Sequence, residues 1–108
     1  MTFKEYSIAA SKTACYPNDV ALAYLVMGLA GEAGELCNKY KKVLRDADGG
    51  LIEENAQAML CESGDVLWYL ARLCDELGSS LETVAKENVV KLASRKERGK
   101  IKGSGDTR

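Results

Sequence analysis

The sequence predicts an all-α protein of about four helices in one domain spanning residues 1–108. Apolar residues recur at three- and four-residue steps along most of the chain, which is the pattern of a buried helix face. Turn-forming residues interrupt this pattern at a Pro-Asn-Asp run (17–19), at an Asp- and Gly-rich run (45–50) and at Gly78, which suits the left-handed position after a helix. No alternating strand pattern remains between these breaks.

Two helices are expected before the Asp- and Gly-rich turn. The first covers about residues 2–12. Asn18 or Asp19 is expected to cap the second, because either side chain accepts a hydrogen bond from an unpaired backbone N–H. The second helix runs to about Leu44, and its predicted buried face is made of Leu22, Leu25, Val26, Leu29, Ala33, Leu36, Tyr40 and Val43.

Two further helices are expected after that turn. The third covers about residues 52–77, with a predicted buried face of Met59, Val66, Leu67, Leu70, Leu73, Cys74 and Leu77. Ser79 and Glu82 have the spacing of a capping box and would open the fourth helix, over about residues 81–98. On one side of that helix lie Leu81, Val84, Ala85, Asn88, Val89 and Leu92. The segment 99–108 is rich in Gly and basic, and we expect a flexible tail there.

Composition excludes several kinds of chemistry. The chain has no His, so imidazole-activated nucleophiles and imidazole zinc sites are ruled out. The four Cys form no Cys-x-x-Cys pair, and we expect reduced packing residues in a cytoplasmic protein. No 18-residue uncharged stretch exists, so no membrane span is expected. The net charge of −1 provides no overall basic field for nucleic acid, although residues 86–108 carry eight Lys and Arg against three acids.

Four carboxylates lie in two matching blocks of the form acid, small residue, glycine, acid. The blocks supply Glu32, Glu35, Glu62 and Asp65. Residues three apart share a helix face, so packing the two helices through their apolar faces would bring the four acids together. A cation removes the resulting repulsion, and an oxygen-only donor set suits Mg²⁺, for which Mn²⁺ can substitute. A glycine in mid-helix costs about 1 kcal/mol relative to Ala, so the glycine of each block predicts close backbone approach.

Polar residues on the same helices could hold a phosphorylated ligand. Lys39 and Tyr69 each follow the first acid of a block by seven residues and lie on the same flank. Asn88, Lys91 and Arg95 share a face of the fourth helix, where Lys91 offers a point charge and Arg95 a planar fork to phosphate. Lys39 and Tyr69 could face either the phosphates of a ligand or a neighbouring carboxylate, and a solvated basic face is the structural alternative for the residues of the fourth helix.

Together these motifs resemble the signature of the MazG-like, all-α nucleoside triphosphate pyrophosphohydrolases. The 26 residues between the acidic blocks, the Asn-x-x-Lys-x-x-x-Arg element at 88–95 and the ending 98–108 are similar to that family. The resemblance implies hydrolysis of a nucleoside triphosphate, in its deoxy form, to the monophosphate and pyrophosphate. It implies that the four acids hold Mg²⁺ and that Glu32 or Glu35 orients or deprotonates the attacking water.

The resemblance also implies substrate-binding residues and an oligomer. The substrate set is Asn88, Lys91, Arg95, Arg98, Lys39, Tyr69, Lys102, Ser104 and Arg108. Only the middle two helices are long, so we expect a homodimer that completes a four-helix bundle, or a homotetramer. Cys61 stands where many members have a glutamate, and a thiol does not replace a carboxylate toward Mg²⁺. Two alternatives stay open: a phosphoribosyl-ATP pyrophosphohydrolase of the same superfamily, and a helical interaction module that needs no metal.

Overall fold

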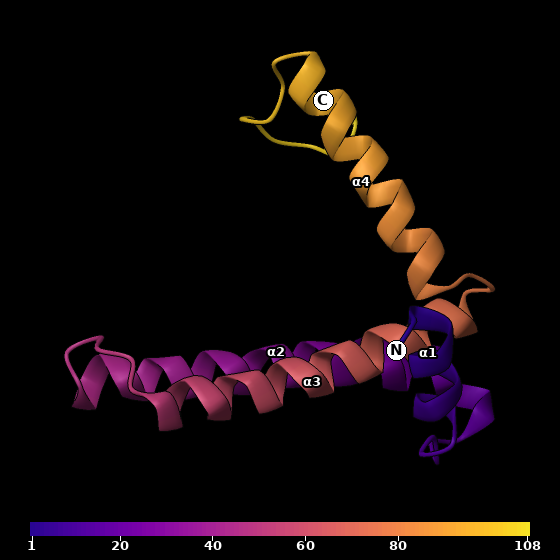
Figure 1. Cartoon of the computed structure of the whole chain (residues 1–108). Helices are drawn as coiled ribbons and strands as arrows, with labels where there is room; N and C mark the ends of the chain where they lie inside the picture. The colour runs from indigo at the N-terminus through magenta and orange to yellow at the C-terminus, as the bar shows by residue number, and fades with distance from the viewer.

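The structure, a computed structural model, describes all 108 residues, and all of its regular secondary structure is helical. The elements are α1 (Phe3–Ser11), the short 3₁₀ helix η1 (Asn18–Val20), α2 (Ala21–Asp46), α3 (Glu53–Glu76) and α4 (Leu81–Glu97). Helices α2 and α3 form a long antiparallel hairpin, and α1 packs where α3 ends (Figure 1). Helix α4 projects away from the hairpin. The predicted all-α class is confirmed.

The starts of α1 and α2 differ from the sequence-based expectation. A capping box opens α1: the Thr2 hydroxyl accepts from the Glu5 backbone N–H at 3.1 Å, and the Glu5 carboxylate accepts from the Thr2 N–H at 2.7 Å. The expected cap of α2 by Asn18 or Asp19 is wrong, because these residues lie within η1 and no side chain caps α2. The backbone oxygen of Asn18 accepts from Ala21 instead, so the 3₁₀ turn leads directly into the helix.

The connection between α3 and α4 also corrects a prediction. Gly78 adopts the expected left-handed conformation, with φ 71°, and ends α3. The Ser79 N–H donates to the Cys74 oxygen at 2.8 Å, so Ser79 belongs to this helix end and does not form a capping box with Glu82. Ser80 caps α4 by accepting from the Thr83 N–H at 3.1 Å.

The buried core of the single chain is small. Only eight of the 108 residues are buried, too few to cover two long amphipathic helices. Ala71, Cys74 and Leu81 form a cluster where α3 meets the first turn of α4, and Tyr6 of α1 packs against it. Leu25 of α2 is fully buried. The core therefore ties together the elements at one end of the hairpin.

Much of the apolar surface that the sequence assigns to a core is exposed. The exposed members of the predicted buried faces include Leu22, Val26, Tyr40 and Leu77, and the apolar residues Val84, Val89 and Leu92 of α4 are exposed as well. Of the cysteines, Cys74 is buried as expected, whereas Cys15, Cys37 and Cys61 are exposed, and all four are free. The reason is geometric: α2 and α3 cover one flank of each other, and α4 leaves the body after its first turn.

One helical segment, Asn18–Asp46, is long enough to cross a membrane and contains an 18-residue stretch that is apolar enough to do so, with a mean hydropathy of 1.4. The 18-residue stretch is not free of charged residues, which is why no membrane span was expected from the sequence. Glu32 and Glu35 lie in the middle of this segment, and a carboxylate within hydrocarbon is unfavourable. One flank of the helix already packs on α3. We therefore attribute its apolar residues to packing between helices.

Candidate metal centre

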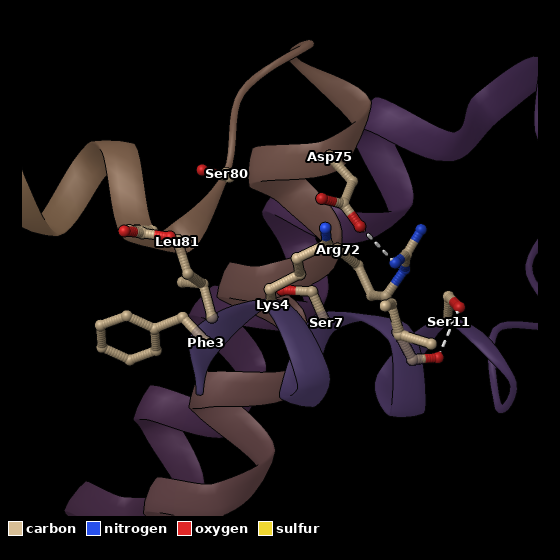
Figure 2. A pocket seen from close by; sticks show the side chains of 10 residues that line it. Phe3, Lys4, Ser7, Ser11, Arg72, Asp75, Ser80 and Leu81 are labelled. Atoms are coloured by element: carbon tan, nitrogen blue, oxygen red, sulfur yellow. Dashed lines mark hydrogen bonds and ion pairs between the residues drawn. The ribbon is translucent and has the colours of Figure 1, made fainter. Parts of the chain in front are cut away.

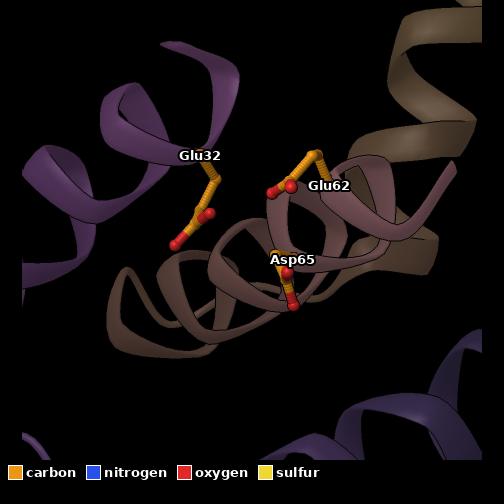
Figure 3. A group of neighbouring side chains, drawn as sticks. All are labelled: Glu32, Glu62 and Asp65. Atoms are coloured by element: carbon orange, nitrogen blue, oxygen red, sulfur yellow. The ribbon is translucent and has the colours of Figure 1, made fainter. Parts of the chain in front are cut away.

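Three of the four predicted acids meet between α2 and α3. Carboxylate oxygens of Glu32, Glu62 and Asp65 lie within 4.8 Å of one another (Figure 3). Glu62 and Asp65 project from neighbouring turns of α3, and Glu32 reaches them from α2. Glu32 and Glu62 are partly buried and Asp65 is exposed. Glu35, also exposed, lies outside this group of three.

The charges at this centre favour a bound cation. Partial burial raises the pKa of Glu32, and the negative charges of Asp65, Glu62 and Glu35 raise it further. The Lys39 ammonium lies 3.4 Å from Glu62 and offsets part of the charge. Sequence analysis left open whether Lys39 faces a phosphate or a carboxylate, and the structure places it at this carboxylate. An oxygen-only donor set with excess negative charge fits Mg²⁺, and the residues present are suitable to hold it.

Mg²⁺ binding is expected to weaken as the pH falls toward the raised pKa of Glu32. In the metal-free protein, ionised Glu32 is less favourable in the fold than in the unfolded chain, so this group lowers stability as the pH rises through its pKa. Mg²⁺ binds the ionised carboxylates and reverses that effect. The increase in Tm on adding Mg²⁺ should therefore be larger near about pH 7.5 than near about pH 5. An equal increase at both pH values, or the same pH dependence in Glu32→Gln, would contradict this.

Aromatic side chains adjoin the carboxylates. Tyr69 lies in tilted contact with Tyr24, at a ring-centre distance of 6.3 Å, and edge-on to Trp68 at 5.0 Å. Burial raises the pKa of Tyr69, with further contributions from Tyr24 and from the nearby charges of Glu32 and Asp65. Sequence analysis found Tyr69 but missed Tyr24, because Tyr24 belongs to no motif and reaches the site only through the packing of α2 on α3.

Trp68 has a packing role. Its indole N–H lies 2.8 Å from the Thr13 hydroxyl and 3.2 Å from the Ala10 backbone oxygen, so it fastens α3 to the end of α1. Tyr16 completes the aromatic group by stacking on Tyr24 at a ring-centre distance of 5.4 Å. This group holds the α2–α3 pair together next to the carboxylates.

The close backbone approach lies at a different glycine from those predicted. A Cβ placed on Gly34 or Gly64 would meet no atom within 4 Å, so the expectation for these two positions is wrong. A Cβ on Gly28 would instead overlap the Tyr69 ring, with Cζ at 2.5 Å and Cδ1 at 2.6 Å. Gly28 lies one helical turn before Glu32, so the absence of a side chain there makes room for the Tyr69 ring beside the carboxylates.

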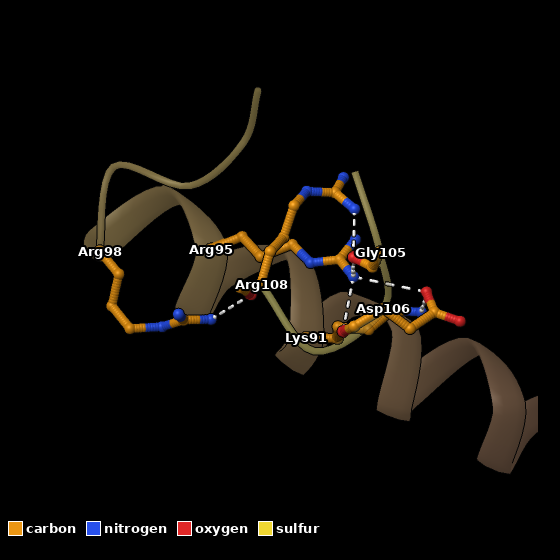
Figure 4. A network of polar contacts seen from close by, with 6 residues as sticks. All are labelled: Lys91, Arg95, Arg98, Gly105, Asp106 and Arg108. Carbon is orange, nitrogen blue, oxygen red and sulfur yellow. Dashed lines mark hydrogen bonds and ion pairs between the residues drawn. The ribbon is translucent and has the colours of Figure 1, made fainter. Parts of the chain in front are cut away.

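The predicted phosphate ligands of α4 gather around the tail (Figure 4). Arg95 is buried, and its guanidinium donates to the backbone oxygens of Asp106 at 2.8 Å and Gly105 at 3.3 Å. Lys91 lies 3.5 Å from the Asp106 carboxylate. The Arg98 guanidinium donates to the main-chain oxygen of Arg108 at 2.9 Å. The remaining predicted members, Asn88, Lys102 and Ser104, are exposed.

This cationic group and the carboxylates do not meet within one chain. Helix α4 contacts the rest of the molecule near Leu81, and its other end lies far from the middle of α2 and α3 (Figure 1). Sequence spacing places residues on helix faces but does not set the direction in which a helix leaves the body. A single chain therefore carries the two halves of the predicted site separately.

A separate cavity of about 400 Å³ lies at the junction of α1, α3 and α4 (Figure 2). Arg72, which follows the second acidic block by seven residues, lines this cavity. Its guanidinium pairs with Asp75 at 2.6 Å and donates to the Tyr16 hydroxyl at 3.4 Å. Arg72 is therefore engaged in structural contacts away from the carboxylates.

Comparison with known proteins identifies the chain's relatives. Residues 21–99 match the family model of the MazG nucleotide pyrophosphohydrolase domain, which includes all three clustered carboxylates and the α4 cations. The chain is 51% identical over 109 residues to the Gene 37 protein of Mycobacterium phage L5, covering 95% of this chain and 96% of that protein. No solved structure matches it. The all-helical fold, the paired carboxylates and the family match agree, and this chain belongs to the MazG nucleotide pyrophosphohydrolase family.

Proposed function

We propose that this protein hydrolyses a nucleoside triphosphate, in its deoxy form, to the nucleoside monophosphate and pyrophosphate with the help of Mg²⁺. One observation carries the proposal: Glu32, Glu62 and Asp65 converge from two helices in a chain that belongs to a nucleotide pyrophosphohydrolase family. Three carboxylates so close together, with Lys39 offsetting only part of their charge, are unfavourable without a cation. A polyphosphate and a divalent ion are natural ligands for each other and for such a centre.

The carboxylates divide into metal ligands and a base. Glu32, Glu62 and Asp65 would hold Mg²⁺, which when bound supplies positive charge to the phosphate oxygens around the broken bond. Glu35 is exposed beside these ligands and close enough to raise the pKa of Glu32. We assign to Glu35 the orientation and deprotonation of the water that attacks the α-phosphorus. Glu32 is the other candidate for that role, and its raised pKa is suited to accepting a proton.

A second copy of the chain would supply the phosphate ligands. The cations of α4 lie far from the carboxylates of their own chain, and a large apolar surface on α2, α3 and α4 is exposed. A homodimer, or a homotetramer, would bury these faces in a four-helix bundle and bring Lys91 and Arg95 of one chain toward the carboxylates of the other. Cross-complementation tests this: mixing inactive Asp65→Asn and inactive Lys91→Gln proteins should restore activity in the heterodimers.

The aromatic group would form the wall of a base pocket. Tyr24 is 40% exposed and lies against Tyr69, whose own environment includes the charges of Glu32 and Asp65. A nucleobase stacked on Tyr24 would therefore lie beside a triphosphate held at the carboxylates. Base preference depends on the groups that surround this wall in the assembled oligomer.

Product analysis tests the reaction. With a panel of the common deoxynucleoside and ribonucleoside triphosphates and phosphoribosyl-ATP, we expect monophosphate and intact pyrophosphate from at least one deoxynucleoside triphosphate, and no turnover in EDTA. A diphosphate with orthophosphate would contradict attack at the α-phosphorus. Turnover of phosphoribosyl-ATP alone would assign the alternative substrate. Absence of turnover with every substrate, and a Tm that does not respond to Mg²⁺, would favour the interaction module.

A further inference from the structure

The segment 103–108 folds back along α4 and covers its cations, and we call it the tail strap. Gly99 leaves the helix with φ 63°, and the Lys100 N–H donates to the Arg95 oxygen at 2.7 Å. Gly103 and Gly105 have φ of 125° and 85°, conformations that other residues rarely adopt. These glycines reverse the chain and return Asp106 to the side of Arg95 (Figure 4).

The tail strap provides acceptors to a buried cation. Only 5% of Arg95 is exposed, and one of its terminal nitrogens faces three oxygens: the backbone oxygens of Gly105 and Asp106, and the Asp106 carboxylate at 3.4 Å. The Nε atoms of Arg95 and Arg108 are buried without a hydrogen-bond partner. Buried polar atoms are nearly always paired, so an anion that displaces the tail strap would find two unpaired donors there.

Positive charge is in excess around the tail strap. Lys91 and Arg95 contact the Asp106 carboxylate, the one acidic side chain of the tail strap, whereas Arg98 and Arg108 donate to the main-chain oxygens of Arg108 and Gly105. The positive charge of Lys91 has the largest effect in lowering the pKa of Asp106, and hydrogen bonds from Lys91 and Arg95 lower it further. This carboxylate is therefore ionised at neutral pH. The Asp106 side chain is 88% exposed, and an anion from solvent can replace it without unfolding the helix.

We propose that Asp106 is an internal competitor for phosphate, which occupies the Lys91–Arg95 pair in the resting protein and must be displaced when a polyphosphate binds. A carboxylate between two cations satisfies the same donors as a phosphate oxygen but carries less charge. The tail strap therefore weakens the binding of any anion that uses the same donors. The inference rests on the proposed function for the identity of the anion, but inorganic pyrophosphate alone tests it.

Titration calorimetry with inorganic pyrophosphate, without Mg²⁺, measures the competition. Exposed ion pairs are weak, so Asp106→Asn should lower the Kd of pyrophosphate by a factor of about two to ten. Glu97→Gln is the matched control: it removes one exposed negative charge from the same end of α4 but not from the contacts of Lys91 or Arg95. An unchanged or higher Kd in Asp106→Asn, or an equal decrease in Glu97→Gln, would overturn the proposal.

Limited trypsin digestion of the wild-type protein reports the position of the tail. Displacement of the tail strap by pyrophosphate should speed up cleavage after Lys100 and Lys102, because loosened chain ends are preferred cleavage sites. Protection by pyrophosphate would show that the tail closes over the anion as a lid, and would overturn displacement. Neither measurement involves turnover. If the enzyme is active but Asp106→Asn binds pyrophosphate with an unchanged Kd, the competitor role of Asp106 is rejected and the proposed function is not. Tighter binding in a protein without turnover keeps the competitor and rejects the proposed function.

Discussion

Replacing Asp65 by Asn should lower kcat/KM for the triphosphate by at least about 100-fold, the size of loss typical of a group that acts electrostatically on the transition state. The substitution keeps the side-chain volume and removes one of the three negative charges that lie within 4.8 Å. Asp65 is exposed, so the change should leave the fold intact. The increase in Tm produced by Mg²⁺ should shrink in parallel, since that increase measures cation affinity.

Glu53→Gln is the matched control for this experiment. Glu53 opens the same helix and is exposed, but it lies outside the carboxylate group. Its removal changes the net charge by the same amount and should leave kcat/KM within about twofold, as expected for a surface charge away from the site. Wild-type turnover in Asp65→Asn would show that the acidic block of α3 is a solvated face. Equal losses of kcat/KM in both variants would show that the effect comes from the change in net charge.

Replacing Gly28 by Ala should destabilise the fold by about 1–3 kcal/mol, the usual effect of adding a methyl group to a packed contact. The added Cβ would overlap the Tyr69 ring, so α2 and α3 must separate or the ring must turn. Because Gly28 is one turn from Glu32, separation of the helices would also draw Glu32 away from Glu62 and Asp65. We therefore expect a lower unfolding midpoint in urea together with weaker Mg²⁺ binding.

Gly31→Ala provides the comparison, because it lies in the same helix with no atom within 4 Å of an added Cβ. That substitution should raise stability by up to about 1 kcal/mol through helix propensity alone. Opposite signs for the two variants would locate the close approach of the helices at Gly28. Stabilisation by Gly28→Ala would show that the Tyr69 ring moves freely and that the helix spacing does not depend on this glycine.

Helices and their ends follow from local chemistry, and most of them were predictable. Hydrophobic period, the Asp- and Gly-rich turn and Gly78 placed α2 and α3 to within about two residues. One error came from the 3₁₀ turn before α2, and the other came from competition between neighbouring helix ends: Ser79 completes α3, which leaves Ser80 to cap α4. Only one residue can be the N-cap of α4, and the backbone hydrogen bonds at the end of α3 and the start of α4 decide which residue it is.

The sequence predicted those features of the carboxylate site that depend only on the pitch of each helix. Spacing of three residues places Glu62 and Asp65 on one face, and two similar blocks indicate that a partner from α2 should face them. That the partner is Glu32, with Glu35 outside the group, depends on how α2 and α3 are aligned along each other. The contact of Gly28 with Tyr69, which joins residues far apart in the sequence, is one of the contacts that fix this alignment.

The sequence by itself determined an all-α chain with two acidic blocks and a basic end, because helix period, turn chemistry and charge are local properties. Only the tertiary structure decided that Tyr24 lies against Tyr69, that α4 leaves the body and that Asp106 returns to Arg95. Each of these depends on long-range packing or on a chain reversal, in which a few degrees of backbone rotation change which side chains meet. Residue spacing fixes neighbours within a helix, and packing between helices fixes the rest.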